Sequence, residues 1–252
     1  MNYIGIDIGS TATKLAIIKD NGQINFKVLP TGWNSKITAE IIKEDLINEF
    51  GNLEDTFITA TGYGRNSVAY ADKKVTEITC HGLGGFTLNG GDCSIIDIGG
   101  QDTKFINVKN GKVLDFLMND KCAAGTGKFI EVMANRLGVT IDELFDLSEI
   151  GTPIPISSLC TVFAESEVIN YMGEGRKKED LAAGIIDSVA LKVVTFVQRK
   201  DISDDVIITG GLSHNKFFAE LLSKKLRKPV STTENGRYAG AYGAALTSKN
   251  SI

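Results

Sequence analysis

Residues 7–14 read DIGSTATK, and residues 97–104, ninety positions later, read DIGGQDTK. Five of the eight positions are identical, and an apolar run rich in β-branched residues precedes and follows each segment. A polar turn that contains glycine and is too short for a crossover helix joins antiparallel strands. The sequence therefore predicts the same strand–turn–strand unit twice in one chain.

Further periodic segments follow each repeated unit. Residues 24–29 and 112–116 read as third strands, 55–60 as another strand and 206–208 as a buried strand. The helices expected from apolar periodicity or small-residue content cover residues 36–50, 128–137, 181–199, 215–226 and 239–246. The last of these, AGAYGAAL, has the small side chains of a helix that packs closely on another element. We therefore expect an α/β protein built from two related halves.

The composition excludes several classes of function. With 252 residues, of which 42% are hydrophobic, the chain can bury a substantial core. A net charge of −4 gives no basic surface for nucleic acid or an anionic membrane. The sequence has neither a leader pattern nor an apolar run of membrane-spanning length, so we expect a cytoplasmic protein. Four cysteines in a cytoplasmic chain of this size argue against a disulfide framework, and the lack of a CxxC pair argues against a zinc site closed within one chain.

The repeated turns have the residue types of a phosphate site. In each turn an aspartate leads into glycine, followed by hydroxyl or amide side chains and a lysine. Glycine lets backbone N–H groups approach a phosphate, lysine adds positive charge, and aspartate can hold Mg²⁺. A third glycine turn, IITGGLSHN at residues 207–215, follows a predicted strand and opens a predicted helix. Together the three turns predict a nucleotide site.

These turns resemble the phosphate-1, phosphate-2 and adenosine motifs of the actin/hexokinase/Hsp70 ATPase superfamily. The resemblance implies an actin/hexokinase/Hsp70-like α/β fold with two ribonuclease-H-like halves that close on Mg-ATP. Residues 1–72 would form the first half and residues 73–236 the second, which includes the cysteine segments considered below. A C-terminal helix at about residues 237–252 would return to the first half.

The motif match assigns residues to the nucleotide. The expected phosphate ligands are Ser10, Thr11, Ala12, Thr13 and Lys14 in the first turn, and Gly99, Gly100, Gln101, Asp102 and Lys104 in the second. The expected nucleoside contacts are Gly210, Gly211, Asn215 and Arg237. The expected catalytic residues are Asp7, Asp97, Gln101 and Asp102, of which Asp7 and Asp102 would hold Mg²⁺.

Two cysteines precede predicted helices. Residues 118–129, MNDKCAAGTGKF, look like a phosphate loop in which Cys122 replaces the first glycine, and Cys160 precedes VFAESEVI. A helix N-terminus favours a thiolate and a bound anion. Two thiolates half-fill a four-thiolate cluster, so Cys122 and Cys160 from two copies can hold one [4Fe–4S] cluster on a two-fold axis. The alternative is that both are buried core thiols.

The segments TGYGRN, NDKCAAGTGKF and CTVFAESEV resemble signatures of the ATP-dependent activator family of 2-hydroxyacyl-CoA dehydratases, whose relatives include benzoyl-CoA reductase ATPase subunits. The resemblance extends over residues 3–246. It implies a homodimeric iron–sulfur ATPase of anaerobic metabolism, with one [4Fe–4S] cluster per dimer and with ATP/ADP and Mg²⁺ as further cofactors. The electron would come from ferredoxin or flavodoxin and pass to an acceptor iron–sulfur protein.

Other segments, such as VTEITCHGLGG and YAGAYGAAL, resemble the branch that serves double-cubane cluster proteins or dehydratase-like proteins. Arg237 departs from the family, whose activators tend to carry glutamine there. Two other classes stay open: a small-molecule kinase with structural cysteines, and an actin-like switch or scaffold. A kinase would need a carboxylate base facing a substrate pocket. A chain of 252 residues leaves little room for the sugar-binding insertions of such kinases.

Five further residues can be interpreted individually. We expect His81 to be structural, and we interpret Cys80 and Cys93 as ordinary thiols. Glu165 and Glu167 fall in the first turns of a predicted helix, where acidic residues interact favourably with the helix dipole. They could also orient that helix or a hydrolytic water.

Overall fold

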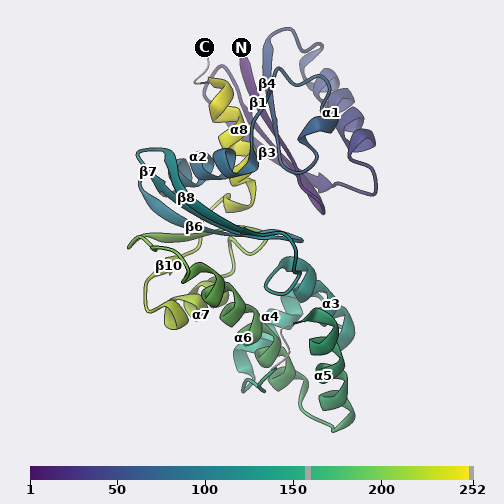
Figure 1. Ribbon diagram of the computed structural model, residues 1–252. Coiled ribbons are helices and arrows are strands. Elements are labelled where there is room, and N and C mark those ends of the chain that lie inside the picture. The colour runs from purple at the N-terminus through teal and green to yellow at the C-terminus, as the bar shows by residue number, and fades with distance from the viewer. Residues whose placement is uncertain (157–159, 250–252) are drawn as a thin grey trace. The chain divides into compact units, whose positions relative to one another are not determined.

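The computed structural model describes residues 1–156 and 160–249 (Figure 1). Residues 157–159 of the segment before Cys160, and residues 250–252 of the expected C-terminal helix, lie outside the described residues. The structure therefore does not test the predictions made for these residues.

The first sheet contains the first repeated unit. It comprises β1 (Asn2–Ile8), β2 (Ala12–Ile18), β3 (Ile24–Pro30), β4 (Thr56–Thr61) and β5 (Lys73–Lys74), in the order β3-β2-β1-β4-β5. β1 and β2 pair antiparallel, as predicted, and β1 and β4 pair parallel. This register places Asp7 opposite Lys14 on one side and opposite Thr61 on the other.

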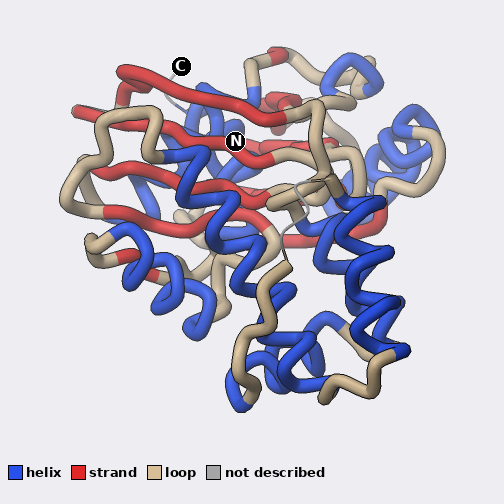
Figure 2. Tube along the Cα trace, turned by 60° about the horizontal axis from the view of Figure 1, so that its bottom comes forward, coloured by secondary structure: helices blue, strands red, loops and turns tan. Residues whose placement is uncertain are grey.

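The second sheet has the same order for the second unit. It comprises β6 (Cys93–Ile98), β7 (Thr103–Lys109), β8 (Lys112–Asn119), β9 (Val206–Gly210) and β10 (Val230–Ser231), in the order β10-β9-β6-β7-β8. Read from its other edge, this order matches the first sheet strand for strand, and Figure 2 shows the strands in red. The internal repeat of the sequence is therefore a repeat of sheet topology.

The helices complete the two halves. They are α1 (Ser35–Phe50), α2 (Glu77–Asn89), α3 (Gly127–Leu137), α4 (Ile141–Ile150), α5 (Thr161–Gly173), α6 (Lys178–Val197), α7 (Lys216–Leu226) and α8 (Ala239–Lys249), with 3₁₀ turns η1 (Arg65–Ser67) and η2 (Gly236–Tyr238). Sequence periodicity missed α2 and α4. α2 carries three glycines, so its buried face lacks the apolar stripe that identifies an amphipathic helix. Among the described residues, no helix is both long and apolar enough to cross a membrane.

The chain forms two compact units. The first contains residues 1–95, 106–116 and 233–252, and the second contains residues 96–105 and 117–232. Residues 73–95 thus group with the first unit, whereas the expected halves meet after residue 72, because α2 packs along α8. Each unit has its own apolar core: β1, α1 and β4 contribute to the first, and α3, α6 and α7 to the second.

Glycines allow α8 to approach its neighbours backbone to backbone. A Cβ on Gly5 of β1 would strike the Ala241 carbonyl, and one on Gly84 of α2 would strike the Ala239 carbonyl. A Cβ on Gly243 of α8 would strike the Cys80 carbonyl. The prediction that the small residues of the C-terminal segment pack closely on another element is confirmed.

We expect Gly84→Ala to lower the free energy of unfolding by about 1–3 kcal/mol, because the added methyl group overpacks a contact between two backbones. Urea titration followed by circular dichroism measures the change. Gly91→Ala is the matched control, since a Cβ there meets nothing within 4 Å. Equal stability of the two variants would contradict the close approach of α2 and α8.

Candidate functional site

The first phosphate turn joins β1 to β2. The Gly9 N–H donates to the Ala12 carbonyl (3.2 Å), while Ser10 and Thr11 are exposed. The Thr31 hydroxyl donates to the Gly9 carbonyl (2.8 Å), so in its contact with Thr13 (2.9 Å) the Thr13 hydroxyl is the donor. The Thr13 proton is therefore used inside the turn. Ser10, Thr11 and Lys14 are the other predicted side chains with hydrogen-bond donors there, and none of the three is buried.

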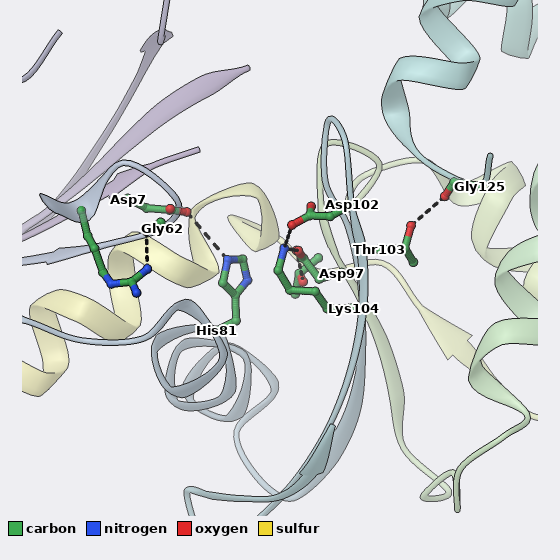
Figure 3. A network of polar contacts seen from close by, with 10 residues as sticks. Asp7, Gly62, His81, Asp97, Asp102, Thr103, Lys104 and Gly125 are labelled. Atoms are coloured by element: carbon green, nitrogen blue, oxygen red, sulfur yellow. Dashed lines mark hydrogen bonds and ion pairs between the residues drawn. The ribbon is translucent and has the colours of Figure 1, made fainter. Parts of the chain in front are cut away.

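Asp7, at the end of β1, is almost fully buried. His81 of α2 lies beside it, with 3.7 Å between His81 Nε2 and Asp7 Oδ2 (Figure 3). Gly62, which has a φ of +84°, and Gly240 both lie so close that a Cβ would strike the Asp7 carboxylate. The Gly62 carbonyl accepts a hydrogen bond from Arg65 (3.0 Å). Two glycines and a histidine thus fix the position of this carboxylate.

Sequence reasoning missed these three neighbours of Asp7. His81 was interpreted as structural, Gly62 only as part of a family signature and Gly240 only as a packing residue. The available signal was the glycine in TGYGR, because a turn without side chains lets a carboxylate lie against the backbone.

The second phosphate turn contains a buried charge cluster. Lys104 Nζ lies 2.7 Å from Asp102 Oδ2 and 3.3 Å from Asp97 Oδ2, and the Thr209 hydroxyl donates to Asp97 Oδ1 (2.7 Å) (Figure 3). Asp97 and Lys104 are almost fully buried, as a charged group can be only when it is paired. Two carboxylates and one ammonium leave one net negative charge, which favours a divalent cation. Lys104, expected on the phosphate, pairs here with these carboxylates.

The remaining predicted residues of the second turn surround this cluster. Gly99 and Gly100 are half-buried and Gln101 is exposed. The Gly99 N–H donates to the Asp102 carbonyl (2.9 Å), which closes the turn. The second turn therefore leaves Gln101 exposed and pairs Asp102 with Lys104.

The third glycine turn lies against the second. The Gly211 N–H donates to the Ile98 carbonyl (3.0 Å), and a Cβ on Gly210 would lie 3.0 Å from Asp97 Oδ1. The Asn215 side-chain oxygen accepts a hydrogen bond from the Phe218 N–H (2.8 Å) and caps α7. Arg237 is exposed in η2, in the first unit. The nucleoside contacts assigned to these residues remain predictions.

The four cysteines fall into two classes. Cys80 and Cys93 are buried, and burial raises the pKa of Cys80 to about 12, so that it is a neutral thiol at pH 7. Cys122 and Cys160 are exposed, one in the loop before α3 and the other as the N-cap residue of α5. The alternative of buried core thiols is therefore wrong for Cys122 and Cys160.

The segment after Cys122 is hydrogen-bonded to the second phosphate turn. The Gly127 N–H donates to the Gly99 carbonyl (2.9 Å), and the Lys128 N–H donates to the Gly100 carbonyl (2.7 Å). The Thr103 hydroxyl donates to the Gly125 carbonyl (2.8 Å) (Figure 3). Two of the N-terminal N–H groups of α3 thus bind the phosphate turn.

The two cysteine-bearing helices are also connected to each other. Arg136 of α3 forms an ion pair with Glu165 of α5. Glu165, considered at the sequence level as an orienting residue for the cluster helix, is therefore the partner of a residue on the other helix. A displacement of α3 would act on α5 through this pair.

The environment of Cys122 and Cys160 fits an anionic group. Lys192 of α6 has a buried Nζ to which the described residues offer no hydrogen-bond partner. Burial lowers the pKa of Lys192, and the charges of Cys122, Cys160 and Glu167 act in the opposite direction. A buried ammonium near two exposed cysteines is suited to a thiolate-bound, negatively charged cluster. Within the described part of one chain, no three His, Cys, Asp or Glu side chains come together as a metal site.

The fold and its repeated turns define an ATPase of the actin/hexokinase type. A glucokinase of the ROK family from Streptomyces griseus, solved with glucose and AMPPNP, superposes with a TM-score of 0.60 at 15% identity, covering 99% of this chain and 100% of the other. At that identity the likeness concerns the fold alone. The predicted fold class is confirmed.

The chain belongs to the BadF/BadG/BcrA/BcrD ATPase family, whose model matches residues 4–248. The (R)-2-hydroxyglutaryl-CoA dehydratase activating ATPase of Acidaminococcus fermentans is 45% identical over 247 residues, which are 96% of this chain and 95% of that one. The structure of that organism's dehydratase component A has a TM-score of 0.92 at 43% identity and covers 100% and 98% of the two chains.

A second solved relative is the activator of the 2-hydroxyisocaproyl-CoA dehydratase from Clostridium difficile, with bound ADPNP. It has a TM-score of 0.91 at 38% identity, and the match covers 100% of this chain and 95% of that one. The predicted resemblance to the dehydratase activators is therefore confirmed, and the protein is an ATPase.

We expect Lys104→Met to lower the free energy of unfolding by about 3–5 kcal/mol, because the buried Asp97 carboxylate loses its cation. Denaturant titration measures the loss. Lys128→Met, which removes an exposed ion pair with Glu131, is the control and should change stability by about 0–1 kcal/mol. Adding Asp97→Asn to Lys104→Met should recover part of the stability. A loss as small as that of the control would contradict a buried charge cluster.

Proposed function

We propose that the protein is an ATP-dependent iron–sulfur activator that delivers a low-potential electron to a partner iron–sulfur protein. The observation that carries the proposal is the hydrogen bonding between the second phosphate turn and the start of the Cys122 helix. A turn that responds to the γ-phosphate would move the backbone to which Cys122 is attached. The relatives described above, named as dehydratase activators, support the same role.

On the nucleotide side, each turn has its own task. Ser10, Thr11 and Lys14 bind phosphate oxygens, and Asp7 holds Mg²⁺ directly or through water. In the second turn, Asp102 reaches the metal while Lys104 pairs with Asp97 and holds it in place. Gln101, which is exposed beside them, orients the attacking water.

On the cysteine side, Cys122 and Cys160 of two copies hold one [4Fe–4S] cluster, which when bound supplies a one-electron carrier. The exposure of both cysteines supports a site completed by a second copy. Next to Cys160 on α5, Val162 and Phe163 are 65% and 67% exposed, which supports a homodimer contact at the same place.

The helix ends tune the electron carrier but are too weak to drive it alone. A helix N-terminus contributes roughly 0.3–1 kcal/mol to a nearby negative charge, and up to about 2 when partly buried. Since about 59 mV corresponds to 1.4 kcal/mol for one electron, two helices change a potential by tens of millivolts to about 150 mV. Binding of the acceptor and the change in solvation that follows supply the remainder.

The donor in this proposal is ferredoxin or flavodoxin, and the acceptor is a double-cubane cluster protein or a dehydratase-like component. Both assignments come from the family resemblance. The competing assignment, a small-molecule kinase, predicts a colourless protein that phosphorylates sugars and does not need Cys122 or Cys160.

Anaerobic purification tests the cluster. We expect a brown dimer with about four iron atoms per two chains, because four thiolates hold one cluster. Cys122→Ser and Cys160→Ser should each lose the iron, while Cys93→Ala, at a buried thiol, keeps it. Iron analysis and the visible absorption of the cluster measure the result. A wild-type protein without iron, or a wild-type iron content in both serine variants, would contradict the proposal.

Gly127 tests the connection between nucleotide and cluster. We expect Gly127→Pro to abolish the difference in cluster potential between the ADP-bound and ATP-bound protein, because proline removes the N–H that binds the Gly99 carbonyl. The backbone conformation admits proline there because residue 127 is the first of α3 and Thr126 is extended, but the ring takes the place of the N–H and displaces the Gly99 carbonyl.

Gly127→Ala is the matched control, since it keeps the N–H and adds a Cβ 3.2 Å from the Gly99 carbonyl oxygen. It should keep the nucleotide-dependent difference that Gly127→Pro loses. Redox titration followed by electron paramagnetic resonance measures the potentials. An unchanged difference in Gly127→Pro would mean that the signal does not pass through this hydrogen bond.

A further inference from the structure

Lys192, in the C-terminal half of α6, presents a charge that the proposed function has not used. Its Nζ is buried and has no hydrogen-bond partner among residues 1–156 and 160–249, although the residue as a whole is only half-buried. A buried ammonium without a partner is unfavourable, because the charge loses its water and gains nothing in return. Such a group indicates a missing negative partner.

The surroundings of Lys192 locate that partner. Its Nζ lies 4.3 Å from the centre of the Phe129 ring, a favourable but weak contact for a cation. A Cβ on Gly125, which has a φ of +89°, would lie 3.5 Å from Lys192 Cβ. The lysine therefore runs beside the segment between Cys122 and Phe129.

The electrostatic environment agrees with this location. Burial lowers the pKa of Lys192, and the charges of Cys122, Cys160 and Glu167 act in the opposite direction. Lys104, which is buried as a whole residue, has two carboxylates within 3.3 Å. Around Lys192 Nζ, the part of the chain that the structure describes places no hydrogen-bond acceptor within reach, and the charges of Cys122, Cys160 and Glu167 act on it.

We infer that Lys192 is the resident counter-cation of the cysteine site, which stabilises the anionic iron–sulfur cluster and raises its reduction potential. The inference rests on the proposed function, since it needs a cluster held by Cys122 and Cys160. Reduction takes one electron from the donor protein, adds one negative charge and moves no proton. A fixed positive charge nearby favours the more negative, reduced form. In a dimer, two Lys192 side chains act on one cluster.

The same lysine can make the potential depend on the nucleotide. It belongs to α6, whereas Cys122 precedes α3, which is hydrogen-bonded to the second phosphate turn. A movement of α3 relative to α6 changes the distance between the ammonium and the cluster. Lys192 is thus a positioning and tuning residue, and it need not contact ATP.

Redox titration of the iron-loaded dimer in ADP tests the inference. For a unit charge within about 10 Å of a partly buried site, we expect Lys192→Gln to lower the equilibrium constant for reduction about tenfold. For one electron this is a shift of about 59 mV toward negative potential. Lys192→Met should shift in the same direction, and Lys192→Arg should stay close to the wild type because it keeps the charge.

Lys178→Gln is the matched control. It removes the same charge from the same helix at an exposed position, 14 residues away and therefore about 21 Å along the helix axis. Its potential should equal that of the wild type. Iron content and circular dichroism show whether each variant is loaded and folded.

The outcomes separate this inference from the proposed function. Iron-loaded Lys192→Gln and Lys192→Met with the wild-type potential would overturn the role of Lys192 and leave the proposed function standing. A wild-type protein that holds no iron would overturn both. Loss of iron in folded Lys192→Gln, with full loading of Lys192→Arg, would support a counter-cation that the cluster requires.

Discussion

The hydrogen bonds between the second phosphate turn and the start of α3 connect the nucleotide site and the cluster site proposed for the protein. The carbonyls of Gly99 and Gly100 accept the N–H groups of Gly127 and Lys128, so the nucleotide turn and the Cys122 segment share one backbone network. Hydrogen bonds of this kind are geometrically strict, because they weaken steeply when the angle at the hydrogen departs from linearity. A small shift of the turn must therefore move the helix or break the bonds.

Buried charges explain why these turns keep one shape. Asp97 and Lys104 are both buried, and each would be strongly unfavourable without the other. Asp7 is held differently, by His81 and by two glycines that leave no space for a second position. The Asp7 and Asp97 carboxylates thus each have a fixed position within their own unit, which reduces the reorganisation that hydrolysis requires.

Residue types and local periodicity were enough to predict much of the fold. The repeated turns predicted the same strand–turn–strand unit twice, and the small residues of the C-terminal segment predicted its close packing. α2 was not predicted from the sequence, because its glycines leave its buried face without an apolar stripe. Residues 73–95 belong to the first unit because α2 packs on α8. Local patterns cannot reveal such a contact, since it depends on which distant backbone comes close.

By itself the sequence determined the repeated turns, the glycines that shape them and the two cysteines that precede helices, because these depend on residue type and spacing. The tertiary structure alone decided which groups meet. It paired Lys104 with Asp97 and Asp102, placed His81 beside Asp7 and joined α3 to the second turn. It also buried the Lys192 ammonium where the charges of Cys122 and Cys160 act on it and where no described residue accepts a hydrogen bond from it. Electrostatic pairing depends on distance in space, and no spacing along the chain encodes that distance.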